Sequence, residues 1–177
     1  MPEIEIRPAI ATDIKTLISL EHASESDYVW QVDIHRATGE VDVLLREVRL
    51  PRTVTVRYPR PTQTLVDDWN KTPMLVAVSA NQLVGYLRMT DQFAAGTVWI
   101  TDLVIGPSFR KKGIATALIM AAHQWAQQRG SHRAVIEAPS KNNAAIQLAQ
   151  KLGYEFCGYN DQYYVSRDVA LFFGRLI

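Results

Sequence analysis

The chain has 177 residues, of which 19 are Lys or Arg and 18 are Asp or Glu, so its formal net charge at pH 7 is +1. This length predicts one domain, residues 1–177, and a charge so close to zero excludes a global field that would steer the protein to nucleic acid or to an anionic membrane. A single cysteine, Cys157, excludes an internal disulfide, and without an apolar run of about 18 residues the chain is predicted to be cytoplasmic and not membrane-bound.

Residues 1–72 carry short alternating patterns and no long apolar ones. Ile4 and Ile6 alternate with charged residues as in a strand, and Thr12-Asp13 is typical of a helix start. In chain order we expect a strand at 4–8, a helix from Thr12 to about His22, a polar loop at 25–30, hairpin strands between 31 and 60 that turn at Thr38-Gly39-Glu40, and a short helix at 62–70. The apolar run in the middle of residues 31–60 also fits a helix.

From Pro73 onward the pattern is clearer, because each apolar run is bounded by a turn signal. Asn81-Gln82 separates two apolar runs, which predicts a β-hairpin, and a strand that follows a crossover helix is expected to be parallel to the strand before that helix. We expect strands at 74–79, 83–89 and 97–105, a long helix to Arg129, a strand at 134–138, a helix at 142–152, and a terminal strand pair at 156–159 and 169–173. The predicted fold is a mixed α/β domain with a twisted, mostly antiparallel and partly parallel sheet flanked by helices.

A basic turn joins the strand at 97–105 to the long helix. Gly106-Pro107 ends the strand, and small residues follow the cations where the helix begins. The free N–H groups of a helix's first turn and the positive end of its macrodipole favour an anion, and Gly113 permits a ligand to approach the backbone closely. The turn therefore predicts a phosphate site. Since the chain has no GxxxxGK[ST] motif, this site is not that of a P-loop nucleotide triphosphatase.

Two motifs in this order resemble the GNAT superfamily of acetyl-CoA-dependent N-acetyltransferases. The family's loop has Gln or Arg, two residues, Gly, one residue and then Gly or Ala, which Arg110, Gly113 and Ala115 match. Its second motif is an Asn followed by an apolar helix that ends in Lys-x-Gly-aromatic, matched by Asn142, Ala145, Ile146, Lys151, Gly153 and Tyr154. The resemblance covers residues 73–177 and implies an acetyl-CoA-binding core there, with residues 1–72 on the acceptor side.

The resemblance also implies how acetyl-CoA, the co-substrate, binds. Backbone amides of the basic turn would hold its pyrophosphate, and Asn142 would contact the pantetheine arm or its phosphate end. Three strand residues would lie beside pantetheine, with one backbone N–H there polarising the thioester carbonyl. The turn residues are Arg110, Lys111, Lys112, Gly113, Ile114, Ala115 and Thr116, and the strand residues are Leu103, Val104 and Ile105.

Shorter matches resemble the bacterial streptothricin acetyltransferases, which belong to the same superfamily. They lie at 27–32, at 44–48, and around Cys157-Gly158 with Tyr164. They imply a primary amine of a small molecule, a streptothricin-like antibiotic, as the acceptor. A ring of acidic side chains around the acetyl end would favour such a polycationic acceptor; the candidates are Glu25, Asp27, Asp33 and Asp91.

Two other functions stay open at this point. A protein N-terminal or lysine acetyltransferase needs a groove for an extended peptide, which the strands in 31–60 would instead close. A non-catalytic domain that binds acyl-CoA as a sensor is the second. A homodimer is also expected, from the family and from the apolar C-terminal strand, whose free edge would invite pairing.

Acetyl transfer to an amine has to overcome the protonation of that amine. An alkyl amine with a pKa of ~10.4 is neutral in about one part in a thousand at pH 7.4, which corresponds to about 4 kcal/mol. We expect Asp102, in the strand beside the thioester, to accept the proton directly or through water. The alternative for Asp102 is to accept hydrogen bonds from a neighbouring loop, and Glu137 is the reserve candidate for the base.

The acid that reprotonates the departing thiolate is, in many family members, a tyrosine on the helix after the Asn motif, where this chain has Ala149. Either no acid is needed, because a thiol with a pKa of ~8.5 is a fair leaving group, or another tyrosine acts. We expect Tyr164, with Tyr159 and Tyr163 next, unless the three form only an aromatic cluster on the C-terminal strand.

Cysteine and histidine are assigned no part in the chemistry. Cys157 is expected in the core and not as a nucleophile. The histidines lack metal-ligand spacing, so no metal site is predicted, and they are expected at the surface or at helix caps; they are His22, His35, His123 and His132.

Overall fold

The computed structural model describes residues 3–177, so Met1 and Pro2, with which the predicted domain begins, lie outside the described residues. Within that range, seven strands form one sheet in the order β1-β4-β5-β6-β7-β9-β8, and β2 and β3 form a separate ribbon. Every neighbouring pair in the large sheet is antiparallel except β6 and β7, which confirms the predicted mixed sheet. The strands are β1 Ile4–Pro8, β2 Ser24–Ala37, β3 Glu40–Val56, β4 Met74–Ser79, β5 Gln82–Ala94, β6 Thr97–Ile105, β7 Arg133–Pro139, β8 Glu155–Asn160 and β9 Ala170–Leu176.

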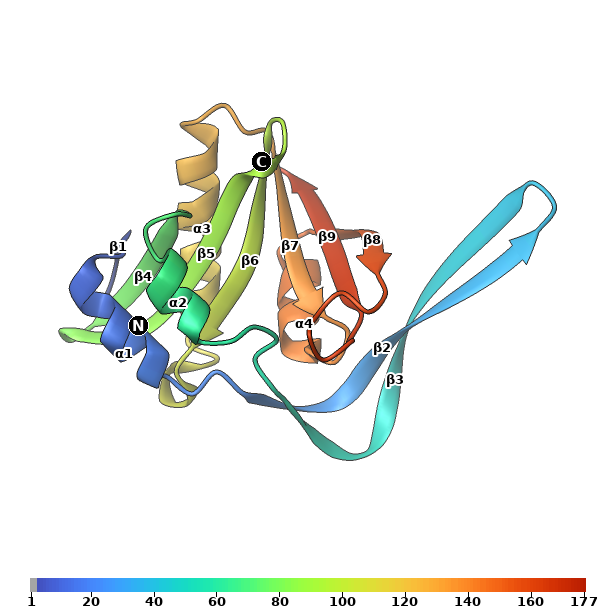
Figure 1. Ribbon diagram of the computed structural model, residues 1–177, viewed down its shortest axis with the longest axis horizontal. Coiled ribbons are helices and arrows are strands. Elements are labelled where there is room, and N and C mark those ends of the chain that lie inside the picture. Colours follow the sequence, from blue (N-terminus) through green and yellow to red (C-terminus); the bar gives the residue numbers. More distant parts are fainter. Residues whose placement is uncertain (1–2) are drawn as a thin grey trace.

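Four α-helices of the described chain cover the two faces of the sheet, α1 and α2 on one face and α3 and α4 on the other (Figure 1). The long helix ends near Gly130, whose φ of 80° permits the chain to turn back towards β7. The first helix is shorter than predicted, because it ends at Ser19 and not near His22. The helices are α1 Ile14–Ser19, α2 Gln63–Asp68, α3 Ile114–Gln127 and α4 Asn143–Lys151.

A β-bulge in β6 decides which of its side chains face which helices. Ile100 packs in the core with α3 and α4, whereas Val104 packs in the core with α1 and α2. Four residues apart in a regular strand, these two side chains would share a face. The register with β5 shifts at Thr101, which has no partner there, and this extra residue exchanges the faces. As a result Asp102 lies on the same face as α1 and α2.

β6 and β7 pair only from Thr97 and Arg133 to Ile100 and Ile136. Beyond these residues β6 stays with β5 and β7 stays with β9, so the two parallel strands separate (Figure 1). The separation begins at Thr101, the position of the bulge, and bulges bend the strand that carries them. The gap leaves backbone groups of residues 101–105 without a strand partner on the β7 side.

β2 and β3 form a long arm that projects from the body of the protein (Figure 1). The base of the arm is attached to α4, where the Trp30 indole N–H donates a hydrogen bond to Asn143 Oδ1 at 2.9 Å. The predicted hairpin with its turn at Thr38-Gly39 is confirmed. The predicted polar loop at 25–30 is wrong, because these residues pair with β3 and belong to the strand β2.

Two surface predictions need correction. The C-terminal strand β9 lies between β7 and β8, so its edges are paired and give no reason for a homodimer; the homodimer stays a prediction without that argument. Cys157 is exposed on β8 and is not in the core. Within residues 3–177, no helix is long and apolar enough to cross a membrane.

Candidate active site

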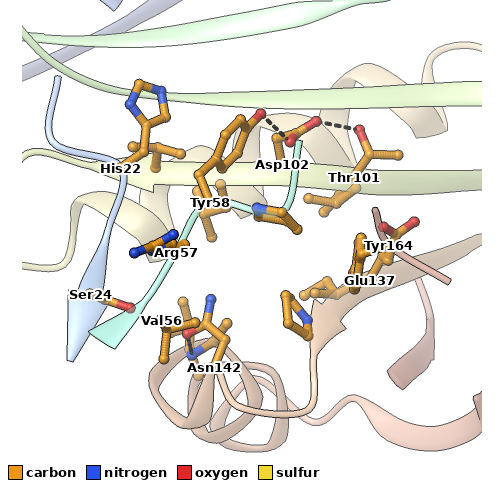
Figure 2. Close-up of a pocket in the computed structure, with 18 of the residues that line it drawn as sticks. His22, Ser24, Val56, Arg57, Tyr58, Thr101, Asp102, Glu137, Asn142 and Tyr164 are labelled. Carbon is orange, nitrogen blue, oxygen red and sulfur yellow. Dashed lines mark hydrogen bonds between the residues drawn. The ribbon is translucent and has the colours of Figure 1, made fainter. Parts of the chain in front are cut away.

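The separated strands enclose a small cavity, of about 70 Å³, to which both faces of the sheet contribute. Figure 2 shows Tyr58, Asp102, Glu137, Asn142 and Tyr164 around this space. A second cavity of about 460 Å³ lies on the side of the loop that follows β3. The two cavities share lining residues in and beside that loop, so they lie next to each other.

The basic turn before α3 forms an amide cradle. Lys111 and Gly113 have φ angles of 60° and 82°, the left-handed conformation that turns successive N–H groups to one side. In residues 3–177, the N–H groups from Lys111 to Thr116 have no hydrogen-bond partner, whereas that of Arg110 donates to Pro107 O at 3.3 Å. A Cβ added at Gly113 would meet no atom within 4 Å, so the space above the cradle is open. The cradle therefore fits a phosphate, with its free donors beginning at Lys111.

The Arg110 side chain braces the cradle instead of pointing into it. Its Nε donates to Ile105 O at 2.9 Å, and its Nη2 donates to Ala23 O at 2.9 Å and to Glu21 O at 3.2 Å. These bonds hold the end of β6 against the segment that joins α1 to β2. The side chain of Arg110, the arginine of the loop motif, thus stabilises the conformation of the site.

Three of the residues predicted to lie beside pantetheine or to contact it line the cavity, whereas Ile105 is not among the lining residues. Leu103 and Val104 line the cavity, and Asn142 lines it while its Oδ1 caps α4 by accepting from Ala145 N–H at 3.2 Å. Ala149 is fully buried in the core instead. Since α4 presents only Asn142, Ala145 and Leu148 to the cavity, it supplies no ionisable group there.

The carboxylate of Asp102 is buried and crowded with donors. Its Oδ1 accepts from the Tyr58 hydroxyl at 2.5 Å and its Oδ2 accepts from Thr101 Oγ1 at 2.9 Å (Figure 2). Oδ1 also accepts from Arg60 at 3.3 Å. Arg88 Nε lies 3.8 Å from Oδ2. With two cations and two hydroxyls around it, the carboxylate has few free positions at which to contact a substrate. The contacts therefore favour a role for Asp102 as a hydrogen-bond acceptor for the loop after β3 over a role as the general base.

Arg60, in that loop, bridges the two separated strands. Its Nη1 donates to Thr101 O at 2.9 Å, and its Nη2 donates to Glu137 Oε1 on β7. Burial raises the pKa of the Glu137 carboxyl, and the charge of Arg60 and its hydrogen bond oppose that rise. The sequence analysis did not predict a role for Arg60, because the segment Pro59-Arg60-Pro61 indicated only a break between elements. Neither carboxylate partner of Arg60 is near it in sequence.

The candidate tyrosines lie in the loop between β8 and β9 and on β8. Tyr164 lines the cavity, and its buried hydroxyl lies near the Glu137 carboxylate without forming a hydrogen bond of regular geometry in residues 3–177. Burial, followed by the negative charge of Glu137, raises the pKa of Tyr164 far above its ordinary value, so it keeps its proton. Tyr163 donates to Glu137 Oε2 at 3.2 Å. Tyr159 alone lies on a terminal strand, β8, so an aromatic cluster on one C-terminal strand is wrong.

Two histidines lie where the sequence did not predict them. His22 lines the cavity and is half-buried, and His123 lies on the buried face of α3. The expectation of a surface or cap position is therefore wrong for both, whereas His35 and His132 are exposed as expected. Neither misplaced histidine belongs to a recognisable motif, so no local signal could have found them.

The acidic residues considered for a polycationic acceptor do not gather at the cavity. None of Glu25, Asp27, Asp33 and Asp91 lines either cavity described above. Asp27 accepts from Thr53 Oγ1 at 2.6 Å, and Asp33 pairs with Arg46 at 2.5 Å, both on the arm. Asp102 and Glu137 line the smaller cavity instead, and Asp168 lines the larger one.

A cradle of free amides beside two separating parallel strands suits an extended, phosphate-bearing ligand, which is the form of coenzyme A. The model of the acetyltransferase (GNAT) family matches residues 43–154, and the chain belongs to this family. It is therefore an acetyltransferase with acetyl-CoA as its co-substrate.

Relatives and solved structures agree with this assignment. The chain is 26% identical over 166 residues to a streptothricin acetyltransferase of Streptomyces lavendulae, covering 90% of this chain and 86% of that protein. Its fold resembles a crystal structure of nourseothricin acetyltransferase with a TM-score of 0.82, at 22% identity and 98% coverage of both chains. It also resembles a proposed streptothricin acetyltransferase of Bacillus anthracis in complex with acetyl coenzyme A, with a TM-score of 0.78, at 18% identity, covering 99% of this chain and 100% of that one.

Proposed function

We propose that the protein transfers acetyl from acetyl-CoA to a primary amine of a small molecule, directly within a ternary complex. The observation that carries this proposal is the bridge by which Arg60 joins Thr101 O, at 2.9 Å, to the carboxylate of Glu137 across the separated strands. A protein acetyltransferase needs an open groove for an extended peptide beside the acetyl end, and this bridge obstructs it. A small amine needs only the cavities on either side of the loop.

We propose a streptothricin-like antibiotic as the acceptor. Support comes from the streptothricin acetyltransferase that aligns with 90% of the chain and from the size of the larger cavity, about 460 Å³, which is typical of sites for drug-sized molecules. The absence of an acidic ring among the described cavity-lining residues means that recognition of a polycation would rest on few contacts near the reacting amine and not on a broad negative surface.

Acetyl-CoA is proposed to bind along β6 and the amide cradle. The free N–H groups from Lys111 to Thr116 would hold its pyrophosphate, and Leu103, Val104 and Ile105 would flank pantetheine, with Asn142 opposite them on α4. The thioester supplies an acetyl group that is already activated. The residues of the chain therefore have to position the amine, accept its proton and stabilise the oxyanion.

For the proton transfers we propose separate roles for the two predicted residues. Asp102 would orient the loop after β3, and Tyr164, whose high pKa keeps it protonated, would donate its proton to the departing thiolate. Asp102→Asn separates this role from that of a base: a loss in kcat much larger than the loss of acetyl-CoA affinity marks a base, and equal losses mark a structural role.

Steady-state assays test the proposed function with acetyl-CoA and a panel of amines that includes nourseothricin, an aminoglycoside, and a peptide with a free N-terminus and a lysine. We expect turnover on a small amine and none on the peptide. Acetylation of the peptide alone would overturn the small-molecule assignment. Tight acetyl-CoA binding without transfer to any amine in single-turnover mixing would instead favour the sensor domain.

A further inference from the structure

A chain of hydrogen bonds runs from the cavity into the sheet and ends on Asp102. The ring of His22 lies beside that of Tyr58, with centroids 4.8 Å apart (Figure 2). His22 Nδ1 is 2.6 Å from Leu20 O, and Nε2 is 3.2 Å from the Tyr86 hydroxyl. That hydroxyl is 3.3 Å from the Tyr58 hydroxyl, which is 2.5 Å from Asp102 Oδ1. No local pattern in the sequence links these residues.

The two ends of this hydrogen-bond series, Leu20 O and Asp102, determine where its protons lie. A carbonyl oxygen only accepts, so His22 Nδ1 carries the proton that bonds Leu20 O, and Nε2 of a neutral imidazole is then an acceptor. At the other end, Asp102 Oδ1 accepts from Tyr58 and from Arg60, and Arg88 lies 3.8 Å from Oδ2. The Tyr58 proton is therefore committed to Asp102.

This series of hydrogen-bonding contacts consequently has one proton fewer than it has contacts. It contains four contacts, and His22, Tyr86 and Tyr58 bring one proton each. Since two protons are committed at the ends, the single proton of Tyr86 has to serve either Tyr58 or His22 Nε2. When it bonds Tyr58, the Nε2 lone pair has no donor. One additional proton, placed on Nε2, would satisfy every contact at once.

The surroundings of His22 suit a group that gains and loses this proton. Burial lowers the pKa of His22, while the hydrogen bond to Leu20 O and the negative charge of Asp102 raise it. The imidazole is therefore neutral at pH 7, and because the residue is half-buried it retains contact with solvent. The titratable and charged groups packed around it are Glu21 on its own segment, Arg57 and Tyr58 from the end of β3, Tyr86 from β5, Asp102 from β6 and Arg110 before α3.

We propose that His22 accepts the proton of the acceptor amine, with Tyr86, Tyr58 and Asp102 as positioning residues that stabilise the imidazolium. One N–H bond of the acceptor ammonium breaks, and its proton binds Nε2 of His22, directly or through one water. The nitrogen keeps the electron pair and bonds the acetyl carbon with it, while the C–S bond breaks and its electron pair stays on the sulfur of coenzyme A. A second N–H proton of the attached nitrogen passes to this thiolate by way of Tyr164, so that the products are the amide, the thiol and the imidazolium. Nε2–H then donates to Tyr86, Tyr86 to Tyr58, and Tyr58 to Asp102. The imidazolium afterwards releases the proton to solvent through its exposed edge.

This inference rests on the proposed amine acetyltransferase, so its first test uses whichever amine of the panel the wild-type protein acetylates. His22→Gln keeps a polar side chain but not a base, and we expect kcat to fall at least 100-fold, the range typical of a lost general base. His35→Gln, on the exposed arm, is the matched control and should stay within twofold of the wild type. The acetyl-CoA dissociation constant should be unchanged in both variants. Retention of a third or more of kcat in His22→Gln would overturn the assignment.

The second test needs no acceptor, which separates failure of this inference from failure of the proposed function. Nitrogen-15 resonances of the imidazole, followed by NMR in the free protein, report the tautomer and the pKa of His22. We expect the Nδ1–H tautomer, and in Tyr86→Phe a pKa lower by about 0.4 to 1, because the imidazolium loses the acceptor of one hydrogen bond. The acid limb of kcat should move to lower pH in the same variant. An unchanged pKa, or the Nε2–H tautomer, would overturn the proton chain even if no amine is acetylated.

Discussion

Arg60 is the residue on which the two separated strands depend. It is the bridging cation for two carboxylates that are almost completely buried, since the Glu137 and Asp102 side chains are 0% and 1% exposed. A buried carboxylate without its cation pays for desolvation with no compensating attraction. The sheet on its own would not hold β6 and β7 at this separation, because their pairing ends at Ile100 and Ile136.

We expect Arg60→Met to lower the free energy of unfolding at pH 7 by about 3 kcal/mol, the cost typical of breaking a buried pair. The deficit should narrow as the pH falls. Loss of Arg60 raises the pKa of Glu137 further above its unfolded value, so the folded protein takes up a proton first and gains stability on acidification. Urea unfolding at pH 7 and pH 5 measures both effects.

Arg46→Ala is the matched control for this variant. Arg46 also forms an ion pair, with Asp33 at 2.5 Å, but its side chain is 54% exposed. Such surface pairs contribute below about 1 kcal/mol. If Arg60→Met is no more destabilising than Arg46→Ala, the bridge does not hold the strands.

At the scale of elements, a buried histidine joins α3 to the segment between α4 and β8. His123 Nε2 is 2.5 Å from the hydroxyl of Tyr154, both groups being buried. Burial lowers the pKa of His123 to about 4, with a smaller contribution from Arg175. In the unfolded chain, His123 takes up a proton near pH 6.5, whereas in the folded protein it does so only near pH 4. The free energy of unfolding therefore decreases as the pH falls from about 6.5 towards 4.

We expect this proton to cost the wild type about 2 kcal/mol of unfolding free energy at pH 5 relative to pH 7.5. His123→Gln keeps a side chain that can bond Tyr154 but cannot titrate, so this part of the pH dependence should disappear. Urea titrations at the two pH values compare the proteins, with His132→Gln, an exposed histidine, as control. Identical pH dependence in wild type and His123→Gln would show that His123 titrates normally in the folded state.

The arm formed by β2 and β3 is held at its base and free at its end. Trp30 bonds Asn143, and Val32 packs against the main core, whereas Val41 and Val43, further out on β3, are 62% and 43% exposed. A two-stranded ribbon has little stability of its own, so the distal half depends on the base and supports nothing in the body.

We expect the distal half of the arm to be dispensable for folding and acetyl transfer. Asp33 and Leu44 are direct partners in the ribbon, so a two-residue Asn-Gly turn can replace residues 34–43 without changing the register. The shortened protein should unfold within about 1 kcal/mol of the wild type and keep its kcat/KM. Light scattering on both proteins also tests the predicted homodimer. A shortened protein that remains active but changes from dimer to monomer would place the subunit contact on the arm.

At the scale of the whole molecule, patterns local in sequence predicted the fold and the cradle. Neighbouring residues define the hairpin at Asn81, the crossover helix and the two motif segments. The order of these elements was enough to predict the mixed sheet. The site around Asp102 was not predictable in the same way. Its face depends on the bulge at Thr101, and its partners Tyr58 and Arg60 are 44 and 42 residues away. Pairings over such distances leave no periodic trace.

The last prediction concerns binding of coenzyme A by the folded protein. A ligand that binds only the folded state stabilises it by about 2.7 kcal/mol at 100 times its dissociation constant. Gly113→Ala forces alanine into a φ of 82°, which disfavours the cradle conformation, so we expect the stabilisation by a fixed concentration of coenzyme A to fall. Thermal unfolding with and without coenzyme A measures it.

Gly39→Ala is the control for backbone strain. Gly39 lies in the turn of the arm with a φ of 78°, and at both glycines an added Cβ would meet no atom within 4 Å. The two variants therefore carry the same kind of local strain in the free protein, and only the variant at Gly113 disturbs the amides from Lys111 to Thr116. If both variants respond to coenzyme A equally, the phosphates bind elsewhere, and the cradle would be only the capped start of α3.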